Sequence, residues 1–128
     1  MHFFYLIREV IMAFKPAVEL TKLQQDNRFV TLIDGKKILL IWHKDQVHAM
    51  DSQCPHLKLS LAKGKVTDDN SIVCPFHKSE FELASGETKC WSPWPPVVGN
   101  LLGKISKEKN LKIYPTQIEN GQVMVDIR

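Results

Sequence analysis

Cysteine is scarce in this 128-residue chain: there are only three, an odd number that leaves no complete disulfide framework. A strong charge of one sign is also lacking, because 17 Lys and Arg stand against 14 Asp and Glu, for a formal net charge of +3. This weak surplus is scattered and does not favour a nucleic-acid-binding protein. Thiols without a disulfide framework are typical of the reducing cytoplasm, where we expect the protein to reside.

The sequence has no long hydrophobic run. Residues 2–7 are largely apolar, but Arg8 and Glu9 follow at once. The run is too short to span a bilayer and lacks the cleavage site of a signal peptide, so we expect no membrane partner. Residues 1–16 are expected to form an N-terminal extension. Met12 offers an alternative start, and residues 1–11 are either an artefact of start assignment or an amphipathic arm.

No sustained helical period appears after residue 13. The β-prone residues 29–33 and 36–42 flank Asp34-Gly35, which predicts a hairpin. Residues 111–114 and 122–127 predict a second one around an Asn-Gly turn. Further turns and short strands are expected at residues 44–46, 47–50, 71–73, 81–83 and 85–87. This pattern predicts an all-β fold, either an antiparallel sandwich or a barrel.

Two short segments carry chemistry: Cys54-Pro55-His56 and Cys74-Pro75-Phe76-His77. Each offers one thiolate and one imidazole. Two sulfurs and two nitrogens are the ligands of a [2Fe–2S] cluster with mixed ligation, in which the cysteines bind one iron and the histidines the other. The pattern therefore predicts Cys54, His56, Cys74 and His77 as metal ligands.

A Cys₂His₂ zinc site is the main alternative, because zinc accepts the same four side chains. Structural zinc sites usually pair cysteine with cysteine and histidine with histidine, whereas each pair here is mixed. A metal-free arrangement of buried cysteines and surface histidines is the remaining reading. Both alternatives stay open at the level of the residues.

The segments around these residues resemble the Rieske-type ferredoxin domain family. Residues 57–66 are similar to the family's stretch after the first pair, including Leu61 and Gly64, and residues 78–87 resemble the run after the second pair. The resemblance implies one [2Fe–2S] cluster per chain and a Rieske iron–sulfur fold. It implies a Rieske domain over residues 17–128, with a β base and an inserted cluster-binding subdomain at about residues 51–95.

Two departures from the family pattern concern the loops. Lys58 and Lys78 stand where the family commonly has glycine, so a positive φ would strain the backbone there. Leu59 and Phe76 stand where respiratory members carry an additional pair of cysteines. The resemblance therefore points to the disulfide-free branch of ferredoxins and oxygenases.

The resemblance also suggests a second group of residues around the cluster. Ser79 occupies the position of a serine that donates a hydrogen bond to a cluster sulfur in high-potential members, so it is expected to contact the cofactor. Capping of a local turn is the alternative role. Residues 92–99 are proline-rich and either cover the cluster or simply lead back to the base. Cys90 is expected to pack as a small hydrophobic residue.

The resemblance implies a soluble electron carrier without catalytic residues of its own. Its partners would be a flavin-dependent reductase and a terminal oxygenase, met transiently, with Lys58, Lys63, Lys65 and Lys78 steering an acidic surface. The alternatives are the small subunit of a nitrite-reductase-like enzyme and a zinc-binding interaction module. An oxygenase fragment is disfavoured, because no set of two histidines and a carboxylate follows Gly86.

Overall fold

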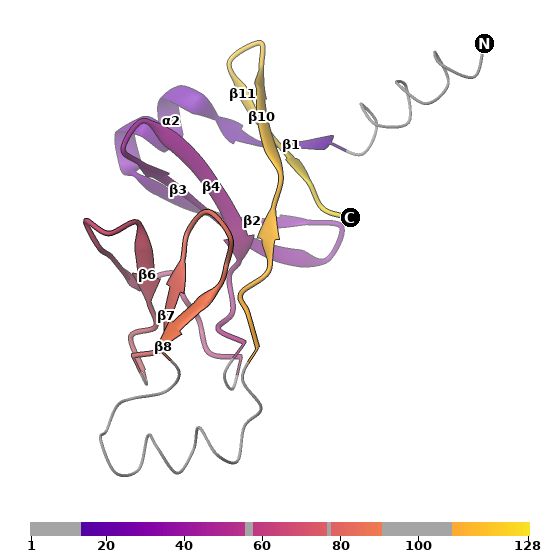
Figure 1. Cartoon of the computed structure of the whole chain (residues 1–128). Coiled ribbons are helices and arrows are strands. Elements are labelled where there is room, and N and C mark those ends of the chain that lie inside the picture. Colours follow the sequence, from indigo (N-terminus) through magenta and orange to yellow (C-terminus); the bar gives the residue numbers. More distant parts are fainter. Residues whose placement is uncertain (1–13, 56–57, 77, 91–108) are drawn as a thin grey trace, which may run out of the picture. The chain divides into compact units, whose positions relative to one another are not determined.

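The computed structural model describes residues 14–55, 58–76, 78–90 and 109–128, which form strands β1 to β11 and one helix, α2 (Figure 1). The chain divides into two compact units, Met1–Ala49 with Tyr114–Arg128, and Met50–Ile113. The strands lie in three sheets whose resolved registers are antiparallel. The predicted all-β class is confirmed. Within the described residues, no helix is long and apolar enough to cross a membrane.

The first sheet joins the two ends of the first unit. Its order is β1 (Phe14–Glu19), β11 (Gln122–Asp126) and β10 (Thr116–Glu119), with β11 in the centre. β1 already begins at Phe14, so it takes in residues that were expected to belong to the N-terminal extension. Residues 1–13 lie outside the described residues.

The second sheet has the order β2 (Arg28–Ile33), β3 (Lys36–His43), β4 (Gln46–Asp51) and β9 (Ile113–Tyr114). The turns that join its first three strands each place two successive residues at positive φ. In the first turn these residues are Asp34 and Gly35, and in the second they are Lys44 and Asp45. Two successive positive φ values define the tight turn whose twist matches paired strands. The predicted hairpin and the turn after it are confirmed.

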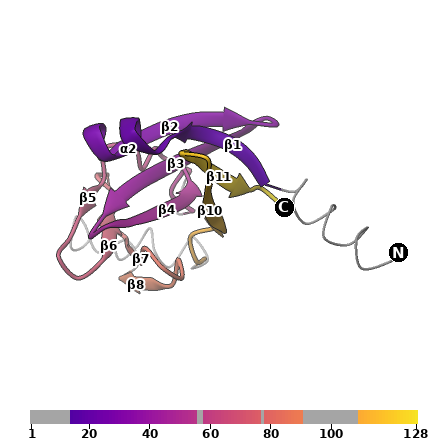
Figure 2. The ribbon, with the colours of Figure 1, turned by 90° about the horizontal axis from the view of Figure 1, so that it is seen from above.

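Helix α2 (Leu20–Asp26) was not predicted from the sequence. It contacts β1, β2 and β3, and Figure 2 shows it next to the first two of these strands. Leu23 is buried and Leu20, three residues earlier, packs partly buried against the same core, but two apolar residues in seven are too few to reveal a helical period. It ends at Asn27, whose left-handed backbone (φ 68°) lets its N–H donate to the Leu23 carbonyl.

The C-terminal hairpin differs from the prediction in its first strand. The expected partner of the last strand was residues 111–114, but β11 pairs with β10, and β9 belongs to the second sheet. The reason is local: Asn120 and Gly121 both have positive φ, and this two-residue turn pairs Glu119 directly with Gln122. The strand immediately before the turn is therefore β10. Figure 1 shows this hairpin in yellow.

The core of the first unit is a single apolar cluster contributed by its strands and by α2. Alternate residues of β3 and β11 point into it, as the two-residue period of a strand requires. Each fully buried aliphatic side chain contributes about 1.5–3 kcal/mol relative to an exposed one. The cluster comprises Val18, Leu23, Ile33, Ile38, Leu40, Ala49, Tyr114, Val123, Val125 and Ile127.

The third sheet lies in the second unit and has the order β5 (Lys65–Val66), β6 (Ser71–Val73), β7 (Glu80–Glu82) and β8 (Thr88–Cys90). Ile72 of β6 lies opposite Phe81 of β7, and both side chains are fully buried. Since β6 ends one residue before Cys74, this hairpin holds the second predicted ligand segment at its tip.

Candidate metal centre

The two cysteine-bearing loops are closed by equivalent hydrogen bonds. In the first, the Cys54 N–H donates to the Leu59 carbonyl at 2.6 Å; in the second, the Cys74 N–H donates to the Ser79 carbonyl at 2.8 Å. Each bond joins a cysteine to the fifth residue after it. The loops therefore have the same size and the same closure, and each cysteine lies at the base of its loop.

Both loops reverse direction at a lysine. Lys58 has a φ of 53° and Lys78 a φ of 63°, and each is the fourth residue after its cysteine. The strain expected from lysine at these glycine positions is therefore present, at about 1–2 kcal/mol for each residue. In the second loop the Lys78 N–H also donates to the Cys74 carbonyl at 3.0 Å.

Strand pairing supports each loop from below. The two ends of the first loop are joined by an antiparallel bridge between Gln53 and Ser60. Next to this bridge, the Leu61 N–H donates a hydrogen bond to the Ser52 carbonyl at 2.7 Å. The second loop rises from the hairpin of β6 and β7. Gly64 follows the first loop, and a Cβ there would lie 2.8 Å from the Val73 carbonyl oxygen. This close approach explains why the position carries glycine.

Both cysteine side chains are almost fully buried, at 1% exposure, and neither forms a disulfide. The predicted partners His56 and His77 lie outside the described residues. Within the described part of the chain, no three His, Cys, Asp or Glu side chains form a metal site. Two buried cysteines, one from each matching loop, fit the sulfur half of the donor set that a mixed-ligand [2Fe–2S] cluster requires.

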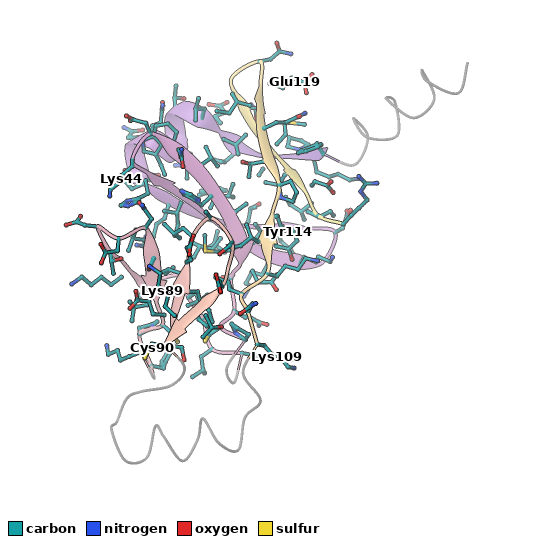
Figure 3. All side chains as sticks on the ribbon, in the orientation of Figure 1. Lys44, Lys89, Cys90, Lys109, Tyr114 and Glu119 are labelled. Carbon is teal, nitrogen blue, oxygen red and sulfur yellow. The ribbon has the colours of Figure 1, made fainter. Side chains whose placement is uncertain are left out.

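The residues around the second loop differ sharply in exposure. Ser79 and Phe81 are fully buried, whereas Phe76 in the loop itself is 50% exposed. Cys90 is exposed at the end of β8 (Figure 3), so the prediction that it packs as a small hydrophobic residue is wrong. It lies in a short strand whose sequence, Thr-Lys-Cys, brings few apolar neighbours. The proline-rich residues 92–99 lie outside the described residues.

A pocket of about 200 Å³ lies beside the first loop, and the sequence did not predict it. It is lined by the loop with the strand before it and by residues 109–112. We call it the basic pocket, because three of its lining residues are lysines. The residues that line it include Asp51, Cys54, Lys58, Lys109, Asn110 and Lys112. Its lysines come from segments that are about fifty residues apart in the sequence, so no local pattern joins them.

Comparison with known proteins gives a consistent result. A model of the Rieske [2Fe-2S] domain matches residues 13–115. The ferredoxin component of a naphthalene 1,2-dioxygenase system from Pseudomonas putida is 27% identical over 111 residues, covering 87% of this chain and 92% of that protein. The ferredoxin component of an alkene monooxygenase system from Xanthobacter autotrophicus is 27% identical over 89 residues, covering 70% and 61%.

Among solved structures, the ferredoxin of carbazole 1,9a-dioxygenase from Nocardioides aromaticivorans IC177 is similar, with a TM-score of 0.71. It is 18% identical, and the match covers 90% of this chain and 98% of that one. At this identity the likeness concerns the fold, and it agrees with the antiparallel all-β architecture described above.

Proposed function

The chain belongs to the Rieske [2Fe-2S] domain family, and from this premise we propose that it is an electron carrier with one cluster held by Cys54, His56, Cys74 and His77. The cysteines would bind one iron and the histidines the other. When bound, the cluster supplies a one-electron redox couple. The family match favours this reading over a zinc module.

The observation that carries the proposal is the matched pair of loops. Each holds one buried cysteine at its base, and each is closed by a backbone hydrogen bond from that cysteine. Strand pairing below each loop limits its movement. Because both cysteine side chains are buried, water would have little access to the iron that they bind, and limited solvent access is one way in which a protein tunes the redox potential of a metal group. Ser79, buried beside the second loop, is proposed as a further contact to the cofactor.

The partners are proposed from the relatives. Two of these are ferredoxin components of a dioxygenase system and an alkene monooxygenase system. By analogy, this protein would accept electrons from a flavin-dependent reductase and pass them to a terminal oxygenase, with no catalytic residue of its own. We also propose a cytoplasmic location and a Rieske domain over residues 17–128, with the cluster-binding subdomain at about residues 51–95.

The test of the cluster is the metal content and the electron paramagnetic resonance spectrum of anaerobically purified protein. We expect iron and inorganic sulfide in the amounts of one [2Fe–2S] cluster per chain, and a spectrum of the dithionite-reduced protein typical of nitrogen ligation. Cys54→Ser and Cys74→Ser should each lose the cluster. Cys90→Ser is the matched control, because this exposed cysteine should leave the iron content unchanged. Protein that contains zinc, or that has no iron after reconstitution, would overturn the proposal.

The carrier role has its own test. With NADH and a purified flavin-dependent reductase, the visible absorption should bleach, and it should recover anaerobically when a terminal oxygenase is added. Substrate oxidation with the reductase and this protein alone would contradict a role limited to electron transfer.

A further inference from the structure

The basic pocket has one rigid wall. Residues 109–112 are held on one side by the β7–β8 region, where the Leu111 N–H donates to the Gly86 carbonyl at 2.8 Å and the Thr88 N–H donates to Asn110 Oδ1 at 3.1 Å. On the other side, the Asp51 N–H donates to the Lys112 carbonyl at 3.0 Å. The backbone that carries Lys109 and Lys112 is therefore anchored next to the first cysteine loop.

The charge of the pocket is strongly one-sided. Among the described residues that line it, Lys58, Lys109 and Lys112 stand against a single carboxylate, Asp51, and all three lysines are exposed. Neither Lys58 nor Lys109 forms an ion pair within the described residues. Lys109 lies in the segment that leads to β9, and in Figure 3 its side chain points away from the ribbon. An anionic group that approaches the pocket would meet lysines of both segments that line it.

Lys58 adds an argument from backbone strain. Its left-handed conformation would cost less with glycine, and yet the chain carries a lysine there. Strained non-glycine residues occur preferentially where they serve a function. Here the residue places a positive charge at the rim of the pocket, four residues after the buried Cys54.

We propose that the basic pocket receives a carboxylate side chain of an acidic partner protein and thereby docks that protein beside the Cys54 loop. The inference rests on the proposed electron-carrier function, which requires a partner to approach this loop. A free carboxylate would gain little, because each contact with an exposed ammonium group contributes only about 0–1 kcal/mol. A carboxylate attached to a larger protein surface adds the contacts of that surface to the same ion pairs.

The experiment compares two one-electron oxidants of opposite charge. The reduced protein passes one electron to cobalt(III), which becomes cobalt(II), and the rate is followed by stopped-flow absorbance. The anionic [Co(EDTA)]⁻ carries carboxylates and stands in for an acidic partner; the cationic [Co(NH₃)₆]³⁺ is its counterpart. The double variant Lys58→Gln/Lys109→Gln should slow the anionic reaction about two- to fivefold at about 10 mM ionic strength and speed the cationic one.

Two variants keep the result interpretable. Lys109 lies outside the cysteine loops. If the double variant loads its cluster poorly, Lys109→Gln alone should still slow the anionic reaction, by part of the amount expected for the double variant. Lys37→Gln, in the first unit, removes the same single charge as Lys109→Gln and should change both rates less than Lys109→Gln does. An equal effect in Lys37→Gln, or no effect in the pocket variants, would overturn the proposal.

A competition experiment distinguishes a docking pocket from a site for free anions. Poly-L-glutamate carries its carboxylates on a polypeptide, and acetate carries them free. At equal carboxylate concentration and ionic strength, poly-L-glutamate should slow the anionic oxidant and acetate should not; equal inhibition by acetate would overturn docking.

Calorimetric titration of poly-L-glutamate into the same variants tests the pocket without electron transfer. Weaker binding by Lys109→Gln than by Lys37→Gln, which has lost the same single charge, supports the pocket, and equal binding overturns it. Protein without a cluster would instead refute the proposed function, so the two failures are distinguishable.

Discussion

Lys58 and Lys78 occupy equivalent positions in two different loops: each is the fourth residue after a cysteine, and their φ angles are 53° and 63°. In both loops the carbonyl of the next residue accepts a hydrogen bond from the cysteine N–H. The left-handed residue turns the chain so that this bond can form. Two segments with different sequences thus reach the same closure, and each presents one buried cysteine.

This relationship predicts that glycine at the two positions stabilises the protein. Lys58→Gly and Lys78→Gly should each raise the free energy of unfolding by up to about 1 kcal/mol. The free energy gained when glycine removes the left-handed strain would exceed the free energy lost because glycine makes the unfolded chain more flexible. Denaturant unfolding at equal cluster loading measures the effect. Lys58→Ala and Lys78→Ala are the matched controls, since alanine removes the charge and keeps the strain. A gain as large with alanine would show that charge, and not φ, is responsible.

Gly86 and Gly35 allow a test of steric space at similar backbone angles, since their φ values are 75° and 82°. A Cβ at Gly86 would overlap the Leu111 carbonyl oxygen, whereas a Cβ at Gly35 meets nothing within 4 Å. Gly86→Ala should therefore lower the free energy of unfolding by about 3 kcal/mol or more, and Gly35→Ala by about 1 kcal/mol. Thermal or urea unfolding of both variants checks the difference. Equal losses would contradict the close approach between Gly86 and the segment before β9.

Ser71 predicts a stabilising substitution. Its side chain is fully buried in β6, and its hydroxyl has no hydrogen-bond partner among the residues that the structure describes. Ser71→Ala should raise the free energy of unfolding by about 0.5–1.5 kcal/mol. A buried hydroxyl without a partner loses its hydrogen bonds to water on folding and forms no hydrogen bond in the protein that would compensate for them. Thr67→Val is the contrasting control. It removes the Oγ1 that accepts a hydrogen bond from the Ser71 N–H at 3.3 Å, and it should destabilise the protein. A loss of stability in Ser71→Ala would refute the assignment.

Ser79 predicts a change in reduction potential. If its hydroxyl donates to a cluster sulfur, Ser79→Ala should lower the reduction potential by on the order of 20–60 mV. This range follows because a hydrogen bond contributes about 0.5–1.5 kcal/mol. For a one-electron couple, about 59 mV corresponds to a tenfold change in the equilibrium constant. Spectroelectrochemical titration measures the shift. Ser60→Ala is the control, because this exposed serine accepts a local hydrogen bond from the Ala62 N–H. The role would be excluded by an unchanged potential in Ser79→Ala.

Features built from neighbouring residues were predictable from the sequence. The Asp34-Gly35 hairpin was predicted because both turn residues tolerate positive φ, and the flanking runs form β2 and β3. The strand that leads into Cys74 was also predicted, from the short run of residues 71–73. Helix α2 was missed because its two apolar residues, Leu20 and Leu23, are too few to produce a recognisable helical period. The C-terminal pairing was misassigned because two candidate strands precede Asn120, and their sheet membership depends on distant partners.

The amino-acid sequence by itself determined the all-β class, the two cysteine segments and the family, because turn residues and ligand types act within a few positions of one another. Only the tertiary structure decided that both loops close alike, that a lysine is left-handed in each, and that Lys58 and Lys109 line one pocket. These properties depend on backbone angles and on hydrogen bonds between remote segments, such as the bond from Leu111 to Gly86. No local sequence pattern encodes a contact whose two sides meet only when the chain has folded.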